Sequence, residues 1–300
     1  MSLLHSFSQL LQDPPPAFAF ELSEAGVACV PCARPGEIRF RELEPGIIAV
    51  SPSRDNVQRP EILAAHVASL FPQPGPNQKK RRTAALVLPD HSARVQVLDF
   101  DSFPGSADEQ RALIRFRVKK SVPFDVDSAA VSYHVQPAGD NGKIDVVAAV
   151  MSLEIIARYE ATFRGAGYLP GVVTTSSLAA LNLVPAEGVT VLAKLSARVL
   201  SVLVSSGARL KLVRTVELDD ISSDDILAVL YPTLAYVEDE LKSRADRLLL
   251  CGFGPLAHAW QPEWQRELGV PVESLQSRAG APGPYNAGLL GYLEGSGAVE

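Results

Sequence analysis

Cysteine is scarce in this sequence, with 3 in 300 residues, which is too few for a disulfide framework. Cys29 and Cys32 form a C-x-x-C pair, but the pair falls in a predicted strand, whereas a redox pair needs a helix N-terminus to lower its thiol pKa. A zinc site would need a second pair, which Cys251 alone does not supply. We therefore expect a reduced, cytoplasmic protein with neither redox nor metal chemistry.

Long apolar runs and positive charge are also lacking. No apolar run approaches the roughly 18 residues that cross a bilayer, and no lysine or arginine precedes the N-terminal leucines as in a secretory signal. The net charge is −6, which argues against nucleic acid as the main partner because phosphate neutralisation needs a basic surface. Because 47% of the residues are hydrophobic, one large or two medium domains can bury a substantial core.

Familiar catalytic motifs are missing as well. There is no G-x-S-x-G elbow and no Walker loop. The histidines do not follow H-E-x-x-H or similar spacing; they are His5, His66, His91, His134 and His258. The sequence therefore predicts no catalytic residues and no metal ligands.

What is present is a repeated order of predicted elements. If residues 76–142 are treated as an insertion, each half reads strand–strand–strand–helix–strand–helix–strand–helix. The expected strands are 17–22, 27–33, 38–43, 144–150 and 171–175, then 189–195, 199–204, 210–218, 248–251 and 270–275. The expected helices are 60–71, 153–165 and 178–183, then 222–244, 256–268 and 285–293. The last helix of each half follows its fifth strand.

The stretch 87–133 organises the first half. A strand ending in Leu-Pro-Asp and a second strand precede a charged helix, in which Ser106 and Glu109 form a capping box. Ile114, Val118 and Val122 repeat every four residues and predict one apolar helical face, which Pro123 ends. We expect a small αβ unit with one apolar face.

This stretch resembles the inserted subdomain of the PilM family, which comprises actin-like cytoplasmic proteins of type IV pilus assembly. The wider resemblance covers residues 17–295, by order of elements. It implies a mixed α/β, actin-like (duplicated ribonuclease-H-like) fold with an insertion in its first half. The implied division is an N-terminal arm (1–16), a first half (17–75 and 143–187), an inserted subdomain (76–142) and a second half (188–300). Only residues 219–223 stand where the family inserts a lid subdomain, which implies a reduced or missing lid.

The resemblance also implies an ATP site between the halves, with an Asp-x-Gly motif in each of two hairpins. Here Glu21 retains an acid but Ser23 takes the glycine position, and Lys194 and Ser196 replace the second motif. Ala28 stands where the family usually has lysine. A glycine-rich adenosine loop survives in part as Gly252, Phe253 and Gly254, which any strand-to-helix turn would also favour. We expect no cofactor, or at best weak binding of Mg-ATP.

The function expected from this resemblance is a scaffold of a type IV pilus or related secretion machine. It would bind the cytoplasmic N-terminal tail of a PilN-like membrane protein through the first half and its insertion, and would contact other pilus components. It would lie at the inner face of the inner membrane, touching the membrane only indirectly. One alternative is an ATP-binding ATPase or kinase of the actin superfamily, against which Lys194 speaks. Another is a GspL-like cytoplasmic domain of type II secretion, whose chain would continue past Glu300 into an apolar segment.

Two further segments have open roles. Residues 1–16 place Leu3, Leu4 and Phe7 on one helical face before three prolines, which indicates an arm folded on the protein or mobile, with membrane or partner docking as the alternative. The basic run 79–82 indicates a solvated loop, or contact with an anionic partner.

Overall fold

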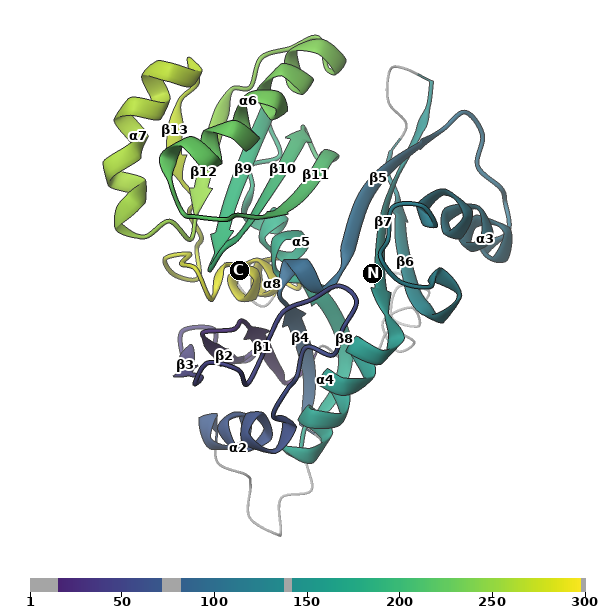
Figure 1. Cartoon of the computed structure of the whole chain (residues 1–300), viewed down its shortest axis with the longest axis vertical. Coiled ribbons are helices and arrows are strands. Elements are labelled where there is room, and N and C mark those ends of the chain that lie inside the picture. Colours follow the sequence, from purple (N-terminus) through teal and green to yellow (C-terminus); the bar gives the residue numbers. More distant parts are fainter. Residues whose placement is uncertain (1–15, 72–81, 138–141, 298–300) are drawn as a thin grey trace, which may run out of the picture.

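The computed structural model describes residues 16–71, 82–137 and 142–297. The N-terminal arm and residues 79–81 of the basic run lie outside the described residues, apart from Pro16. The described chain forms three sheets with helices on their faces (Figure 1).

The first half is built on a five-stranded sheet in the order β3-β2-β1-β4-β8. A hairpin ladder joins β1 to β2 and β2 to β3, while β1, β4 and β8 run parallel. One face packs on α2 and α4 through Phe20, Leu63 and Tyr159. The elements are β1 (Phe18–Leu22), β2 (Gly26–Pro31), β3 (Arg39–Glu42), α2 (Pro60–Leu70), β4 (Thr83–Leu88), α4 (Leu153–Gly165), β8 (Leu169–Thr175) and α5 (Ser176–Ala180).

The second half repeats this topology in the order β11-β10-β9-β12-β13. Its central strand β9 is a nearly continuous buried run, as expected for a strand covered on both faces. The outer face packs on α6 and α7 around Ile226, Leu230 and Trp264. The elements are β9 (Val189–Ser196), β10 (Val199–Ser206), β11 (Arg209–Glu217), α6 (Ser223–Glu240), β12 (Arg247–Cys251), α7 (Pro255–Leu268), β13 (Val272–Ser274) and α8 (Ala287–Gly295). The predicted mixed α/β, actin-like duplication is confirmed.

An inserted subdomain follows β4. Its antiparallel sheet has the order β5-β7-β6 and packs one face on the buried stripe of α3, at Ile114 and Val118. Ser106 caps α3 by accepting the Glu109 N–H at 3.3 Å, as the capping box predicts. The elements are β5 (Arg94–Phe100), α3 (Ala107–Val118), β6 (Ala129–Val135) and β7 (Ile144–Ser152), with short 3-10 helices η1 (Asp90–Ser92) and η2 (Val126–Ser128).

Sheet membership corrects the predicted boundaries of this insertion. The strand Thr83–Leu88 was expected inside it, but pairs in parallel with β1 of the first half. Conversely, Ile144–Ser152 was expected in the first half, but is the central strand of the inserted sheet. Both segments are short apolar runs, and the local pattern does not say which sheet a strand joins. Thr83–Leu88 takes the place in the first-half sheet that was predicted for the later strand, so the order of strands and helices in that half is still the predicted one.

The predicted end of the charged helix is also corrected. The helix α3 ends at Val118 and not at Val122, because the Val118 carbonyl accepts both the backbone N–H and the hydroxyl of Ser121. On α2, Leu63, Val67 and Leu70 are buried and face the core, whereas Ile62 is 38% exposed.

The second half has no room for a lid subdomain, as predicted. The strand β11 ends at Glu217 and α6 begins at Ser223, so residues 218–222 connect them directly. Ser222 accepts the Asp225 N–H at 3.1 Å and thus starts α6 immediately after the connection.

The last helix, α8, lies between the two large sheets (Figure 1). Its Leu289 and Leu293 pack on Ala19 and Ala85 of the first sheet, although α8 follows the second half in sequence. It also contacts α5 closely: a Cβ atom added at Gly291 would lie 2.1 Å from the carbonyl oxygen of Ala179. Small residues therefore set the spacing of the helical layer that joins the halves.

This spacing gives a direct test. We expect Gly291→Ala to reduce the free energy of unfolding by about 1–3 kcal/mol, because the methyl group forces α5 and α8 apart. Gly165→Ala, in α4, is the matched control, since an added Cβ there meets no atom within 4 Å. It should leave stability unchanged or raise it by at most about 1 kcal/mol. Urea unfolding measures both, and equal effects would contradict the close packing of α5 on α8.

Candidate functional site

The strand register makes Glu21 and Lys194 equivalent residues of the two halves. Glu21 in β1 pairs with Ala28 of β2, and Lys194 in β9 pairs with Ser201 of β10. Each precedes the turn of its hairpin by the same number of residues. The position that resembles a metal-facing acid thus carries a carboxylate in one half and an ammonium group in the other.

Lys194 is buried and forms an ion pair with Asp90 of η1. The Lys194 Nζ lies 3.1 Å from Asp90 Oδ2, and the two side chains are only 2% and 3% exposed. The hydroxyl of Ser201 donates to the same oxygen at 2.9 Å, and the backbone N–H of Ser177 donates to Asp90 Oδ1 at 2.6 Å. Both carboxylate oxygens of Asp90 are therefore occupied by groups of the protein.

Glu21 is occupied in the same way. Its Oε1 accepts the hydroxyl of Ser176, and its Oε2 accepts the backbone N–H of Leu289 in the first turn of α8 at 2.7 Å. The carboxylate thus ties β1 to the starts of α5 and α8. We call Glu21, Asp90, Ser176, Ser177, Lys194 and Ser201 the ion cluster.

Burial and charge act in opposite directions within the ion cluster. Burial raises the pKa of Glu21, against the opposing effects of Lys194, the Ser176 hydroxyl and the Leu289 N–H. Burial alone would lower the pKa of Lys194. The nearby carboxylates of Asp90 and Glu21 raise this pKa by more, so it lies above its usual value. Lys194 therefore carries its positive charge at neutral pH.

Ser23 and Ser196 line a small cavity at the turns of the two hairpins. Its volume is about 130 Å³, and His91, Ala197 and Arg198 also line it. Ligand pockets usually span roughly 300–1,000 Å³. The Ser23 hydroxyl donates to the Gly26 carbonyl at 3.0 Å and accepts the Gly26 N–H at 3.1 Å, so it closes its own turn.

The glycine-rich loop between β12 and α7 serves the packing of the second half. Gly252 has φ of +81°, and an added Cβ would lie 2.0 Å from the Leu195 carbonyl oxygen. Phe253 is buried and meets the rings of Trp260 and Trp264 edge-on. These contacts account for the loop sequence without a nucleotide.

These residues do not fit a magnesium–nucleotide complex. An ammonium group stands where the resemblance places a second metal-facing acid, and protein donors occupy the acids that remain. The space left between the hairpin turns is also too small for a triphosphate. We therefore derive no step through ATP.

The two thiols of the C-x-x-C pair lie in and just after β2. Burial raises the pKa of Cys29 far above its usual range and that of Cys32 to about 11. Reactive cysteines have lowered pKa values, so this environment favours an unreactive, structural role for both.

Asp90 and the two serines of α5 were not singled out from the sequence as site residues. Asp90 is the acid of the Leu-Pro-Asp run and lies 104 positions before Lys194. Its place just past the carboxyl end of a parallel strand was the available signal, because ligand-facing groups gather at that edge. In the sequence, this run served only to mark the end of a strand and the family resemblance, and Asp90 was given no role in a site.

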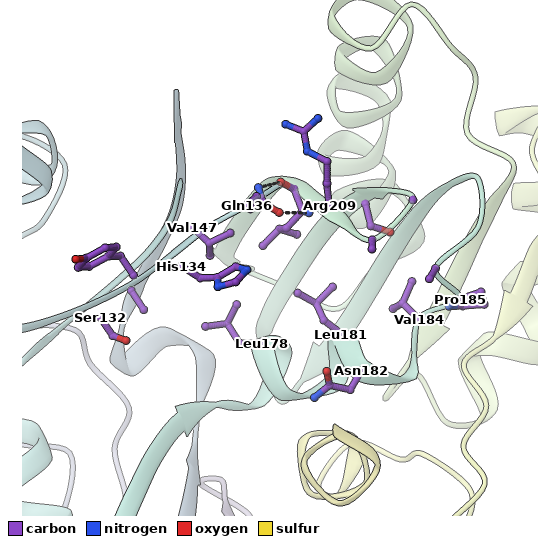
Figure 2. Close-up of a pocket in the computed structure, with 17 residues that line it drawn as sticks. Ser132, His134, Gln136, Val147, Leu178, Leu181, Asn182, Val184, Pro185 and Arg209 are labelled. Carbon is purple, nitrogen blue, oxygen red and sulfur yellow. Dashed lines mark hydrogen bonds between the residues drawn. The ribbon is translucent and has the colours of Figure 1, made fainter. Parts of the chain in front are cut away.

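A larger hollow lies on the other side of the ion cluster and has a volume of about 570 Å³. It opens between the inserted sheet, the α5–η3 segment (η3 is Leu181–Leu183) and the β10–β11 hairpin (Figure 2). We call it the groove. Its apolar residues include Val147, Leu178, Leu181, Val184 and Pro185; its polar ones include Ser132, His134, Asn182, Ser205 and Arg209, and none of the 17 is acidic.

One end of the groove is closed by contacts between the inserted subdomain and the second half. The side-chain amide of Gln136 donates to the Leu210 carbonyl at 2.8 Å and accepts the Leu210 N–H at 2.7 Å (Figure 2). Asp145 of β7 pairs with Arg209 at 2.6 Å and with Lys211 at 2.8 Å. We call these contacts the latch.

The fold is that of actin-like proteins, and comparisons with known proteins agree. No family model and no curated protein matches the sequence. Among solved structures, a PilM–PilN type IV pilus biogenesis complex matches with TM-score 0.70 and 18% identity, covering 95% of this chain and 99% of the other. The cytoplasmic domain of EpsL, an inner membrane component of the type II secretion system of Vibrio cholerae, matches with TM-score 0.50 and 12% identity, over 94% and 95%.

Two kinds of feature are absent from the described residues. No helix there has the length and apolarity that a bilayer crossing requires. The same ranges hold no group of three or more histidine, cysteine or acidic residues placed to bind a metal ion.

The ion cluster predicts a clear pattern of stabilities. We expect Lys194→Met alone to cost about 3–5 kcal/mol in the free energy of unfolding, because it leaves buried carboxylates without their cation. The double variant Asp90→Asn with Lys194→Met removes both charges of the ion pair, leaves only Glu21 without the cation, and should recover part of that loss. Urea unfolding at neutral pH measures each variant.

The control is an exposed ion pair. Arg164 lies 2.7 Å from Glu160 with side-chain exposures of 53% and 26%, so Arg164→Met should change stability by no more than about 0.5 kcal/mol. A Lys194→Met protein as stable as the native one would contradict the buried pair.

Proposed function

We propose that this protein is a cytoplasmic scaffold of a type IV pilus or related secretion machine that acts without a nucleotide. It binds the cytoplasmic N-terminal tail of a PilN-like bitopic membrane protein and through it meets other components of the machine. The observation that carries the proposal is the pairing of a filled nucleotide cleft with a formed, apolar groove elsewhere in an actin-like fold. The likeness to a PilM–PilN complex supports the choice of partner.

The groove has the chemistry of a peptide site. Apolar side chains form its walls and a few polar groups can orient a backbone, as in most ligand pockets. In the described sheet order β6 is an outer strand, so an extended segment can pair with its edge. The Ser205 hydroxyl is buried beside the groove with no hydrogen-bond partner in the described structure.

The charges around the groove narrow the class of tail. No lining residue is acidic and the charge of Arg209 is already paired with Asp145, which favours a segment that is apolar and uncharged where it meets the groove. The net charge of −6 for the whole chain gives no support to a nucleic-acid partner. We place the protein at the inner face of the inner membrane, held there by its partner and not by lipid.

Two other functions stay less favoured. An ATPase or kinase needs a metal-facing acid and an open phosphate site, whereas Lys194 and the small hairpin cavity supply neither. We therefore propose a pseudo-ATPase. A role like that of the EpsL cytoplasmic domain uses the same fold, but its likeness is weaker at TM-score 0.50.

The proposal predicts binding that a single substitution in the groove removes. A synthetic peptide of the cytoplasmic tail of the PilN-type protein from the same cell should bind the native protein in a calorimetric titration. Ala149→Arg places a long side chain in the groove and should weaken binding at least about tenfold. Ala112→Arg, on the exposed face of α3, is the matched control and should bind as the native protein does.

Folding of each variant is checked by urea unfolding before the titration. If the folded native protein does not bind the peptide, the proposed partner is wrong. If Ala149→Arg binds as tightly as Ala112→Arg, the peptide binds elsewhere than in the groove.

A further inference from the structure

We propose that the ion cluster is a permanent internal bridge, which replaces a bound nucleotide as the tie between the two halves and keeps the groove formed in the absence of any ligand. This inference rests on the proposed function, because it concerns how the peptide site is controlled. It predicts that the groove is not regulated by nucleotide.

The bridge links parts of both halves. Asp90 lies in η1, directly after β4 of the first half, and Ser177 lies in α5 of the same half, whereas Lys194 and Ser201 belong to the second half. Three polar contacts join the four residues at 2.6–3.1 Å. Glu21 adds a tie to α8, the helix that lies between the sheets. The contacts therefore cross the plane along which actin-like halves would open.

The same elements carry the ion cluster at one end and the groove at the other. In the α5–η3 segment the backbone N–H of Ser177 donates to Asp90, and the residues that follow, Leu178, Leu181 and Asn182, line the groove. Movement of this short segment would displace one wall of the groove.

The position of the groove wall formed by β10 also depends on Asp90. Ser201 and Ser205 lie on the same face of β10, since side chains alternate along a strand. Ser201 bonds Asp90, and Ser205 lines the groove. Asp90 thus fixes the distance between the two walls at the end of the groove that is remote from the latch.

The buried charges make the bridge persistent. Separating the halves would leave the Lys194 ammonium and the Asp90 carboxylate without partners, and an unpaired buried charge is strongly unfavourable. A nucleotide bridge differs because it dissociates. Because Lys194 is a side chain of the protein and cannot dissociate, the groove is already formed before a peptide binds, which lowers the entropy cost of binding.

The test uses variants that keep the protein folded. The double variant Asp90→Asn with Lys194→Met removes the ion pair and leaves Glu21, held by Ser176 and Leu289, as the one acid of the ion cluster. Ser201→Ala removes one hydrogen bond while keeping the pair. Ala112→Arg is the control. Hydrogen exchange of residues 176–184 and calorimetric titration with the tail peptide are measured on each.

We expect at least about tenfold faster amide exchange in residues 176–184 of the double variant, with the inserted sheet unchanged, and about tenfold weaker peptide binding. Ser201→Ala should give a smaller change in the same direction. A double variant that exchanges and binds like the native protein overturns the bridge. If no variant and no native protein binds the peptide, the proposed function fails, while the exchange data still decide whether the bridge exists.

Discussion

The structure depends on one buried ion pair, Lys194 with Asp90, at the meeting point of the two halves. Two buried acids, Asp90 and Glu21, lie at this point and require a positive charge nearby. Here the chain supplies that charge itself. Because the side chains are almost fully buried, the pair persists only while the halves stay together. The fold is thus held in one arrangement by its own residues.

This constraint separates the two sides of the molecule. On one side the hairpin turns close over a cavity of about 130 Å³, and on the other the inserted subdomain borders a groove of about 570 Å³. Side chains of the protein itself fill the space between the two hairpins, whereas the groove beside the inserted subdomain stays open. The latch through Gln136 and Asp145 holds the far end of that groove, so contacts within the chain fix both of its ends.

Local sequence patterns were enough to predict the two repeated halves and the cap at Ser106, whereas the matching of Glu21 with Lys194 came from the family resemblance. They were not enough for features that depend on long-range pairing. The runs Thr83–Leu88 and Ile144–Ser152 have similar apolar character, so only the assembled sheets reveal that they exchange places. Asp90 meets Lys194 across 104 residues, and Ser176 meets Glu21 across 155, distances over which a hydrophobic pattern carries no information.

The central claim is that the cleft is filled by the protein itself, and a calorimetric titration of the native protein with Mg-ATP tests it most directly. We expect no heat of binding when the native protein is titrated with millimolar nucleotide, with or without magnesium. Saturable, magnesium-dependent binding would contradict it. Glu21 and the loop at Gly252 would then form a working site, and Lys194 would have to leave Asp90 to pair with a phosphate.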